Sequence, residues 1–188
     1  AVDRNGRVME IGEAYADPDV VGEVVIPGFV NAHAHLELSH LAGEIPERED
    51  GMTGFIRQLL AKRFQVSEAD RMKAMIAADE AMYREGIVAV GDISNGLESA
   101  PVKAKSKIYY HTFVELLGMD TSRAEEIISG GIETVIRYRE DFNLPASLSP
   151  HAVYSMSDAL LQLLFTKMNY DEPVTIHLNE SPDEVLFS

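Results

Sequence analysis

The chain has 188 residues, of which 46% are hydrophobic, and a formal net charge of −15. A surface this acidic would repel a nucleic-acid polymer or an anionic membrane, and the chain has no apolar run of about 18 residues that could span a bilayer. Cysteine is absent, so any metal ion must be bound by histidine and carboxylate side chains.

Short runs rich in Val, Ile, Tyr and Thr predict strands, and apolar stripes with polar caps predict helices between the later ones. The expected strands are Arg7 to Ile11, Glu23 to Ile26, Phe29 to His33, Ile87 to Ile93, Ile108 to Leu116, Ala146 to Ser149 and Pro173 to His177. The expected helices are Thr53 to Gln65, Ser67 to Glu85, Thr121 to Phe142 and Ser157 to Met168. This regular alternation favours an α/β fold with parallel strands and crossover helices.

Polar residues able to do chemistry fall at or just beyond the carboxyl ends of different predicted strands. They are His33, His35, Glu115, His151, His177 and Glu180. A (β/α)8 barrel gathers its active site at that rim. A doubly wound sheet also binds ligands at its strand ends, but no Gly-x-Gly-x-x-Gly loop follows any strand here. We therefore predict a TIM-type barrel.

The length of the chain predicts only part of such a barrel. Roughly 160 residues are available for about five barrel strands, whereas eight strands need about 250. Ser181, Pro182, Asp183 and Glu184 have the pattern of a helix start, and only four residues follow them. We expect a piece of a longer enzyme, with a truncated barrel over 27–188 and the remnant of an N-terminal β-domain over 1–26.

The start of the chain has no basic segment followed by an apolar one, so we expect no signal peptide and a cytoplasmic protein. A partial barrel would leave a strand edge unpaired. Such an edge favours association, so we expect the fragment on its own to form a homo-oligomer, exchange elements with a second copy or aggregate.

The segment PGFVNAHAHLELSH places His33 and His35 two residues apart at the end of an apolar strand. In an extended backbone they point to the same face and can bind one ion together. Such a pair alone is often surface decoration. The downstream segment TIHLNES strengthens the prediction of a metal site, because His177 ends a β-branched run and Glu180 follows three residues later.

With these segments, and with GIVAVGDIS and LSPHAVYSMS between them, the sequence resembles the amidohydrolase superfamily. The resemblance is to its cytosine-deaminase-like branch, which includes guanine, S-adenosylhomocysteine and aminofutalosine deaminases, and the continuation HLELS looks most like the last of these. It covers roughly Glu23 to Phe187. It implies a metal-dependent hydrolase that removes an amine from a purine-like heterocycle by means of a metal-activated water.

The resemblance also implies roles for individual residues. His33, His35 and His177 match the ligands of one divalent metal, Zn²⁺ or Fe²⁺, and Glu180 matches a glutamate that carries a proton. His151 matches a fourth-strand histidine that contacts the substrate. Members with two metals often bridge them through a lysine on that strand, and no lysine occurs between Lys107 and Lys167, which favours a single ion.

Two further carboxylates are candidates for contact with the substrate. Glu115 ends the third predicted barrel strand, and Glu37 follows the histidine pair. A salt bridge at a strand end is the more ordinary role for Glu115.

The family's sixth-strand histidine and eighth-strand aspartate have no counterpart in this chain, so we expect the fragment alone to be inactive. Within the same superfamily, hydrolysis of a cyclic amide or loss of chloride are alternative reactions. A non-catalytic binding domain on the same fold is an alternative from another class.

Overall fold

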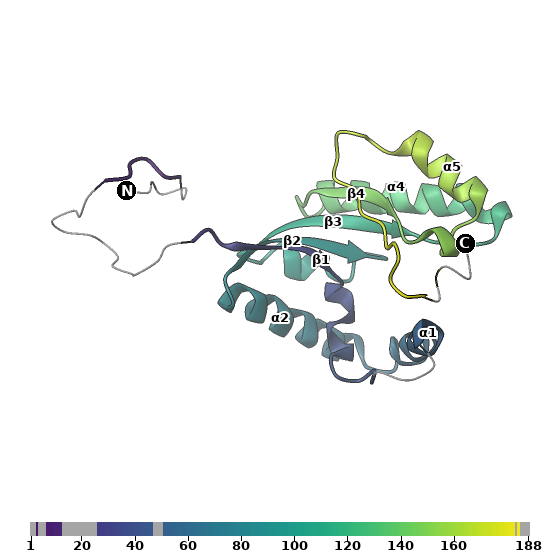
Figure 1. The fold of residues 1–188 in the computed structure, drawn as a ribbon, viewed down its shortest axis with the longest axis horizontal. Helices are drawn as coiled ribbons and strands as arrows, with labels where there is room; N and C mark the ends of the chain where they lie inside the picture. Colours follow the sequence, from purple (N-terminus) through teal and green to yellow (C-terminus); the bar gives the residue numbers. More distant parts are fainter. Residues whose placement is uncertain (1–2, 4–6, 13–25, 47–50, 183, 185–188) are drawn as a thin grey trace.

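The structure is a computed structural model that describes residues 3, 7–12, 26–46, 51–182 and 184 (Figure 1). Its centre is a four-stranded sheet in the order β1-β2-β3-β4, with every neighbouring pair parallel. The strands are β1 (Phe29–Ala34), β2 (Ile87–Ser94), β3 (Tyr109–Leu116) and β4 (Ala146–Pro150). Strands that are consecutive in the chain are therefore neighbours in the sheet, as in successive units of a barrel.

The crossover segments are mainly helical. The α-helices are α1 (Gly51–Lys62), α2 (Glu68–Arg84), α3 (Ala100–Lys103), α4 (Ala124–Glu140) and α5 (Asp158–Lys167). Short 3₁₀ turns follow β1 and precede α4 and α5, at η1 (Leu36–Leu41), η2 (Thr121–Arg123) and η3 (Val153–Ser155). The predicted α/β fold with parallel strands is confirmed, and the long helices lie where the sequence places them. The sequence reading missed α3 and the 3₁₀ turns.

Serine caps fix the starts of two of these helices. Ser67 Oγ accepts a hydrogen bond from the backbone N–H of Asp70, and Ser157 Oγ accepts one from Leu160 N–H. Each cap satisfies a donor that the first helical turn leaves free. Because α2 and α5 begin at these points, their apolar residues are presented to the sheet.

Two apolar clusters join the helices to the sheet. Helix α2 packs beside β2 and η1, while α4 lies along β3 and β4 and contacts α5. The cluster around β2 contains Leu36, Met75, Val90, Val102, Ile108 and Tyr110. The cluster around β3 and β4 includes Val114, Leu116, Ile128, Tyr138, Leu148, Leu160 and Leu164. Burial of these side chains holds the strand ends in fixed positions.

The predicted fifth strand is not formed, and this part of the prediction is wrong. The structure assigns no strand to 173–176, and only an isolated parallel bridge joins His177 to Ala152. Side chains of β4 hold this segment instead. Ser147 Oγ donates to the carbonyl of Pro173 at 2.6 Å, and Ser149 Oγ accepts from Thr175 N–H at 3.3 Å. Serine hydroxyls have taken over bonds that a backbone ladder would make.

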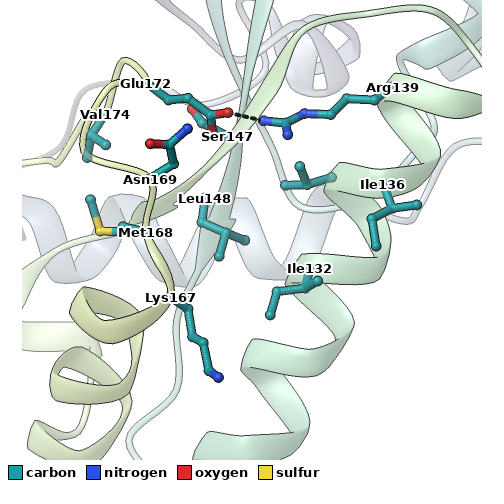
Figure 2. A pocket seen from close by; sticks show the side chains of 11 residues that line it. Ile132, Ile136, Arg139, Ser147, Leu148, Lys167, Met168, Asn169, Glu172 and Val174 are labelled. Atoms are coloured by element: carbon teal, nitrogen blue, oxygen red, sulfur yellow. Dashed lines mark hydrogen bonds and ion pairs between the residues drawn. The ribbon is translucent and has the colours of Figure 1, made fainter.

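A small cavity lies beside this returning segment (Figure 2). It has a volume of about 220 Å³ and lies between α4, β4 and the chain that follows α5. Arg139 and Glu172 form an ion pair of 2.6 Å at this cavity, which ties the segment to the end of α4. The segment therefore runs back beside β4 toward the ends of the strands (Figure 1).

The predicted strand at Arg7 to Ile11 is also wrong, since only Val8 makes a bridge there. The predicted strand at Glu23 to Ile26 falls almost wholly outside the described residues, and the division into 1–26 and 27–188 stays a prediction. Among the residues that are described, no helix is both long and apolar enough to cross a membrane.

Two adjacent glycines of α4 give a test of the packing between this helix and the sheet. A Cβ on Gly131 would lie 2.6 Å from Leu116 Cδ2 and 3.1 Å from Leu148 Cδ2. A Cβ on Gly130 would meet no heavy atom of the described residues within 4 Å. We expect Gly131→Ala to lower the free energy of unfolding by about 1–3 kcal/mol through overpacking.

The matched variant Gly130→Ala should raise that free energy by about 0.5–1 kcal/mol, because alanine is the better helix former. Urea denaturation followed by circular dichroism measures both. Equal effects of the two substitutions would contradict the proposed packing of α4 on the sheet.

Candidate metal centre

Three histidines that are far apart in the sequence converge at the carboxyl edge of the sheet. His35 Nε2 and His177 Nε2 are 3.2 Å apart, and the ring centre of His33 lies 5.2 Å from that of His35 and 4.8 Å from that of His177. One nitrogen from each ring falls within 4.8 Å of the others. Nitrogens that share one ion at about 2.1 Å lie about 3 to 4 Å apart. The three rings are therefore close to the arrangement that a bound ion requires.

The end of β1 is irregular where it carries the first histidine. Asn31 pairs with Val90, and Ala34 pairs with Asp92. Two residues of β1 but only one residue of β2 lie between these pairs, so β1 contains one extra residue here. Asn31 Oδ1 accepts a hydrogen bond from His33 N–H at 3.2 Å within the irregular stretch. Bulges of this kind re-aim side chains next to active sites. His33 and His35 converge as the strand alternation predicts, although their backbone is not a regular strand.

The protonation of these histidines suits metal binding. Burial lowers the pKa of His35 to about 4, and the neighbouring rings of His177 and His33 add to this shift. Burial and then His177 also lower the pKa of His33, against an opposing effect of the Glu180 charge. Both rings are therefore neutral near pH 7, and neutral imidazole is the form that binds a metal.

The third histidine is oriented by the backbone after β4. His177 Nδ1 lies 3.0 Å from the carbonyl oxygen of His151, so Nδ1–H donates to it and the lone pair of Nε2 faces His35. The backbone N–H of His177 donates to the same carbonyl at 2.8 Å. A second partner that fixes the tautomer is the usual companion of a metal-binding histidine.

His151 lies next to this group. Its ring centre is 4.8 Å from that of His177, and its Nδ1 is 2.7 Å from Ser155 Oγ. Burial lowers the pKa of His151, an effect that the nearby charge of Glu115 opposes. The other ring nitrogen, Nε2, is 4.0 Å from Glu115 Oε1. His151 is thus held at one nitrogen and faces the centre with the other.

Glu115, at the end of β3, is buried beside the histidines. Its Oε2 accepts from Asn95 Nδ2 at 2.7 Å. Its Oε1 is buried without a hydrogen-bond partner among the described residues, 3.5 Å from His177 Nδ1. An unpaired buried carboxylate oxygen is costly, so Oε1 has an unmet need for a donor or a cation. Glu115, His151 and His177 also form a second group whose geometry could hold an ion.

Glu37 is buried in η1 and already has protein partners at both oxygens. Arg63 forms an ion pair with Oε1, and Asn95 N–H donates to Oε2 at 3.2 Å. Burial raises the pKa of Glu37, while Arg63 acts against that rise. Arg63, Glu37, Asn95 and Glu115 therefore form one chain of contacts. The sequence reading missed Asn95, although it follows β2 at the same edge where the other site residues lie.

Glu180 is exposed and follows His177 through a tight turn at Asn179, whose φ is 56°. Tyr154 Oη donates to Glu180 Oε2 at 2.9 Å, and Glu180 N–H donates to the Glu184 carboxylate at 2.8 Å. Burial raises the pKa of Tyr154, so its hydroxyl stays protonated and able to donate. The sequence analysis did not identify Tyr154 as a site residue. Tyr154 lies in η3, and no spacing rule links it to Glu180, 26 positions later.

The arrangement provides three imidazoles, a solvent-facing carboxylate and a buried acceptor in one place. Three nitrogen ligands leave further positions open on an ion for water or substrate. The adjacent carboxylate of Glu180 can accept and return a proton. This set of groups fits hydrolysis assisted by a metal.

Comparison with known proteins identifies a family of hydrolases. Residues 24–186 match the model described as "Amidohydrolase family". The chain is 27% identical over 195 residues to a 5-methylthioadenosine/S-adenosylhomocysteine deaminase of Pyrococcus furiosus. The aligned region covers 96% of this chain and 45% of that protein. The resemblance seen in the sequence motifs is confirmed.

Solved structures share the fold. A Helicobacter pylori aminofutalosine deaminase in complex with methylthio-coformycin has a TM-score of 0.66 at 23% identity, over 85% of this chain and 38% of that one. An adenosine deaminase from Xanthomonas campestris with bound zinc has a TM-score of 0.68 at 21% identity, with coverages of 85% and 38%. The chain thus spans less than half the length of the relatives it matches.

Removal of one histidine from the group of three tests whether it holds a metal. We expect His35→Ala to weaken Zn²⁺ or Co²⁺ binding by more than about 100-fold, because loss of an outer partner alone costs 10–100-fold. Isothermal titration calorimetry measures the affinity.

The matched control is His111→Gln. His111 Nε2 contacts Ser147 Oγ at 2.8 Å, and His111 belongs to neither histidine group. The control should bind the ion like the unmodified protein. A His35→Ala variant that retains full affinity would show that these rings do not form a metal centre.

Proposed function

This chain belongs to the amidohydrolase family, and from that membership we propose that the whole protein is a metal-dependent deaminase of an aminated, purine-like heterocycle. The observation that carries the proposal is the convergence of His33, His35 and His177 with Glu180 beside them. The relative in Pyrococcus furiosus is a deaminase of methylthioadenosine and S-adenosylhomocysteine, which supports an adenine-like substrate.

One divalent ion, Zn²⁺ or Fe²⁺, fits the three nitrogens. Imidazole suits both metals, and the Nδ1–H of His177 is already directed away from the ion by the carbonyl of His151. When bound, such an ion lowers the pKa of a water to about 7 and so supplies a nucleophile at neutral pH. The single-ion reading agrees with the absence of any lysine between Lys107 and Lys167.

Glu180 is assigned the proton transfer. Its carboxylate lies close enough to the centre for its charge to act on His33 and His151. Tyr154 Oη holds the carboxylate oxygen Oε2 by a hydrogen bond of 2.9 Å. In the reaction Glu180 takes a proton from the attacking water and delivers it to the ring nitrogen next to the carbon that bears the amine.

Glu115 and His151 are assigned to the substrate. Glu115 Oε1 and His151 Nε2 are 4.0 Å apart, and both side chains lie in one group with His177. Together they provide an acceptor and a ring nitrogen for a ligand with hydroxyl or N–H groups. Glu37 contributes through Asn95, which it holds by one bond and which in turn holds Glu115. Direct contact of Glu37 with the substrate stays a prediction.

Substitution of the proton carrier in the whole protein tests the mechanism. We expect Glu180→Gln to lower kcat for ammonia release from an adenine nucleoside by about 10²- to 10⁴-fold, the usual contribution of a general acid and base. Metal content should not change, since Glu180 is not one of the three nitrogen donors. Glu133→Gln, on the exposed side of α4, is the matched control and should retain activity.

The assay uses the Zn²⁺- or Fe²⁺-loaded protein with adenosine, 5′-methylthioadenosine and 5′-deoxyadenosine, and compares them with a chlorinated ring and a cyclic amide. Ammonia release from the nucleosides supports the deaminase. Release of chloride alone, or ring opening alone, would show that the protein catalyses one of the other hydrolytic reactions and not deamination. Metal binding with no turnover of any compound would favour a binding protein.

A further inference from the structure

A carboxylate on β2 completes the turn that follows the histidine pair. Asp92 Oδ1 accepts a hydrogen bond of 2.7 Å from the backbone N–H of Leu36. Leu36 begins η1, and within the described chain the preceding residue, His35, offers no side-chain cap to this turn. The first free N–H of the turn is therefore satisfied from another strand. The same bond fixes the peptide group between His35 and Leu36.

Asp92 is itself held by a buried lysine. Its Oδ2 forms an ion pair of 2.5 Å with Lys103 Nζ, and both side chains are 0% exposed. The lysine ammonium also donates to Ser94 Oγ and Thr112 Oγ1, each at 3.0 Å. All three of its N–H donors thus have acceptors. The network is fully satisfied, which is the condition under which buried charges rigidify a structure.

The irregular end of β1 makes this anchor important. Regular pairing between β1 and β2 lapses after Asn31 and returns only at Ala34, which pairs with Asp92. The ladder therefore gives little support to the backbone that carries His33. On the far side of the irregular stretch, Asp92 pairs through its backbone and binds Leu36 through its side chain.

We propose that Asp92, locked by Lys103, is a positioning residue that presets the His33 and His35 pair for the metal ion. This inference rests on the proposed metal centre. Asp92 acts through the peptide group that follows His35, and it touches neither the ion nor the substrate. A site of this kind requires its ligands within about 0.5 Å of the productive geometry, which a turn without an anchor would not maintain.

Two double variants separate the hydrogen bond from the charges. Asp92→Asn with Lys103→Met is neutral and keeps an oxygen that accepts from Leu36 N–H. Asp92→Leu with Lys103→Met is equally neutral and has no acceptor. Removal of both charges together avoids leaving one buried charge unpaired, the most destabilising outcome at such a site.

The readouts are Co²⁺ affinity and the visible absorption of bound Co²⁺, which reports ligand geometry. For the Asp92→Leu double variant we expect affinity about tenfold weaker, at the lower end of the loss seen for outer partners, and an altered spectrum. For the Asp92→Asn double variant we expect the affinity and spectrum of the unmodified protein. The proposal is overturned if the acceptor-free variant folds and matches the unmodified protein, or if both variants weaken binding equally.

Circular dichroism reports whether each variant folds. Should the acceptor-free variant not fold, amide hydrogen exchange at Leu36 decides instead. We expect slow exchange both in the unmodified protein and in the Asp92→Asn double variant, and fast exchange in either would contradict the anchor.

Failure of the metal centre itself is recognised separately. In that case the unmodified protein would bind Co²⁺ no better than its His35→Ala variant. Protection of the Leu36 amide would still report whether Asp92 holds the turn.

Discussion

The framework of this site depends on one constraint, that parallel strands all end at the same edge of a sheet. His35 follows β1, Asn95 follows β2, Glu115 ends β3 and His151 follows β4. Because neighbouring strands lie about 4.8 Å apart, side chains at the ends of adjacent strands lie close together whatever their separation in the sequence. The chemistry then follows from which residue types stand at those ends, and here they are imidazoles and carboxylates.

The sequence was sufficient for the features that obey local rules. The apolar runs of β1 to β4, the serine caps Ser67 and Ser157 and the stripe of α4 can each be recognised from residues within one turn or one strand. The convergence of His33, His35 and His151 was predictable for the same reason, since each stands at or just beyond a strand end. His177 joins them although the strand that was expected to carry it is not formed. Their motifs also carried the family resemblance.

Features that depend on distant partners were not predictable in this way. Pro173 to His177 has the composition of a strand, yet Ser147 and Ser149 of β4 bind its backbone and only one bridge forms. Nothing in the sequence marks Lys103 as buried, yet its side chain is fully buried against Asp92. In both cases the outcome is decided by the polar groups that a neighbouring strand presents, and such tertiary context overrides local propensity.

The loose attachment of the segment that carries His177 has a thermodynamic consequence. His35 and His177 are 142 residues apart, and a single ion held by both would close a loop across the whole sheet. A ligand that binds only the folded form shifts the folding equilibrium toward that form by mass action. An ion at this edge would therefore hold in place a segment that has few backbone hydrogen bonds to the sheet. The stability of the fold would then depend on the concentration of free metal.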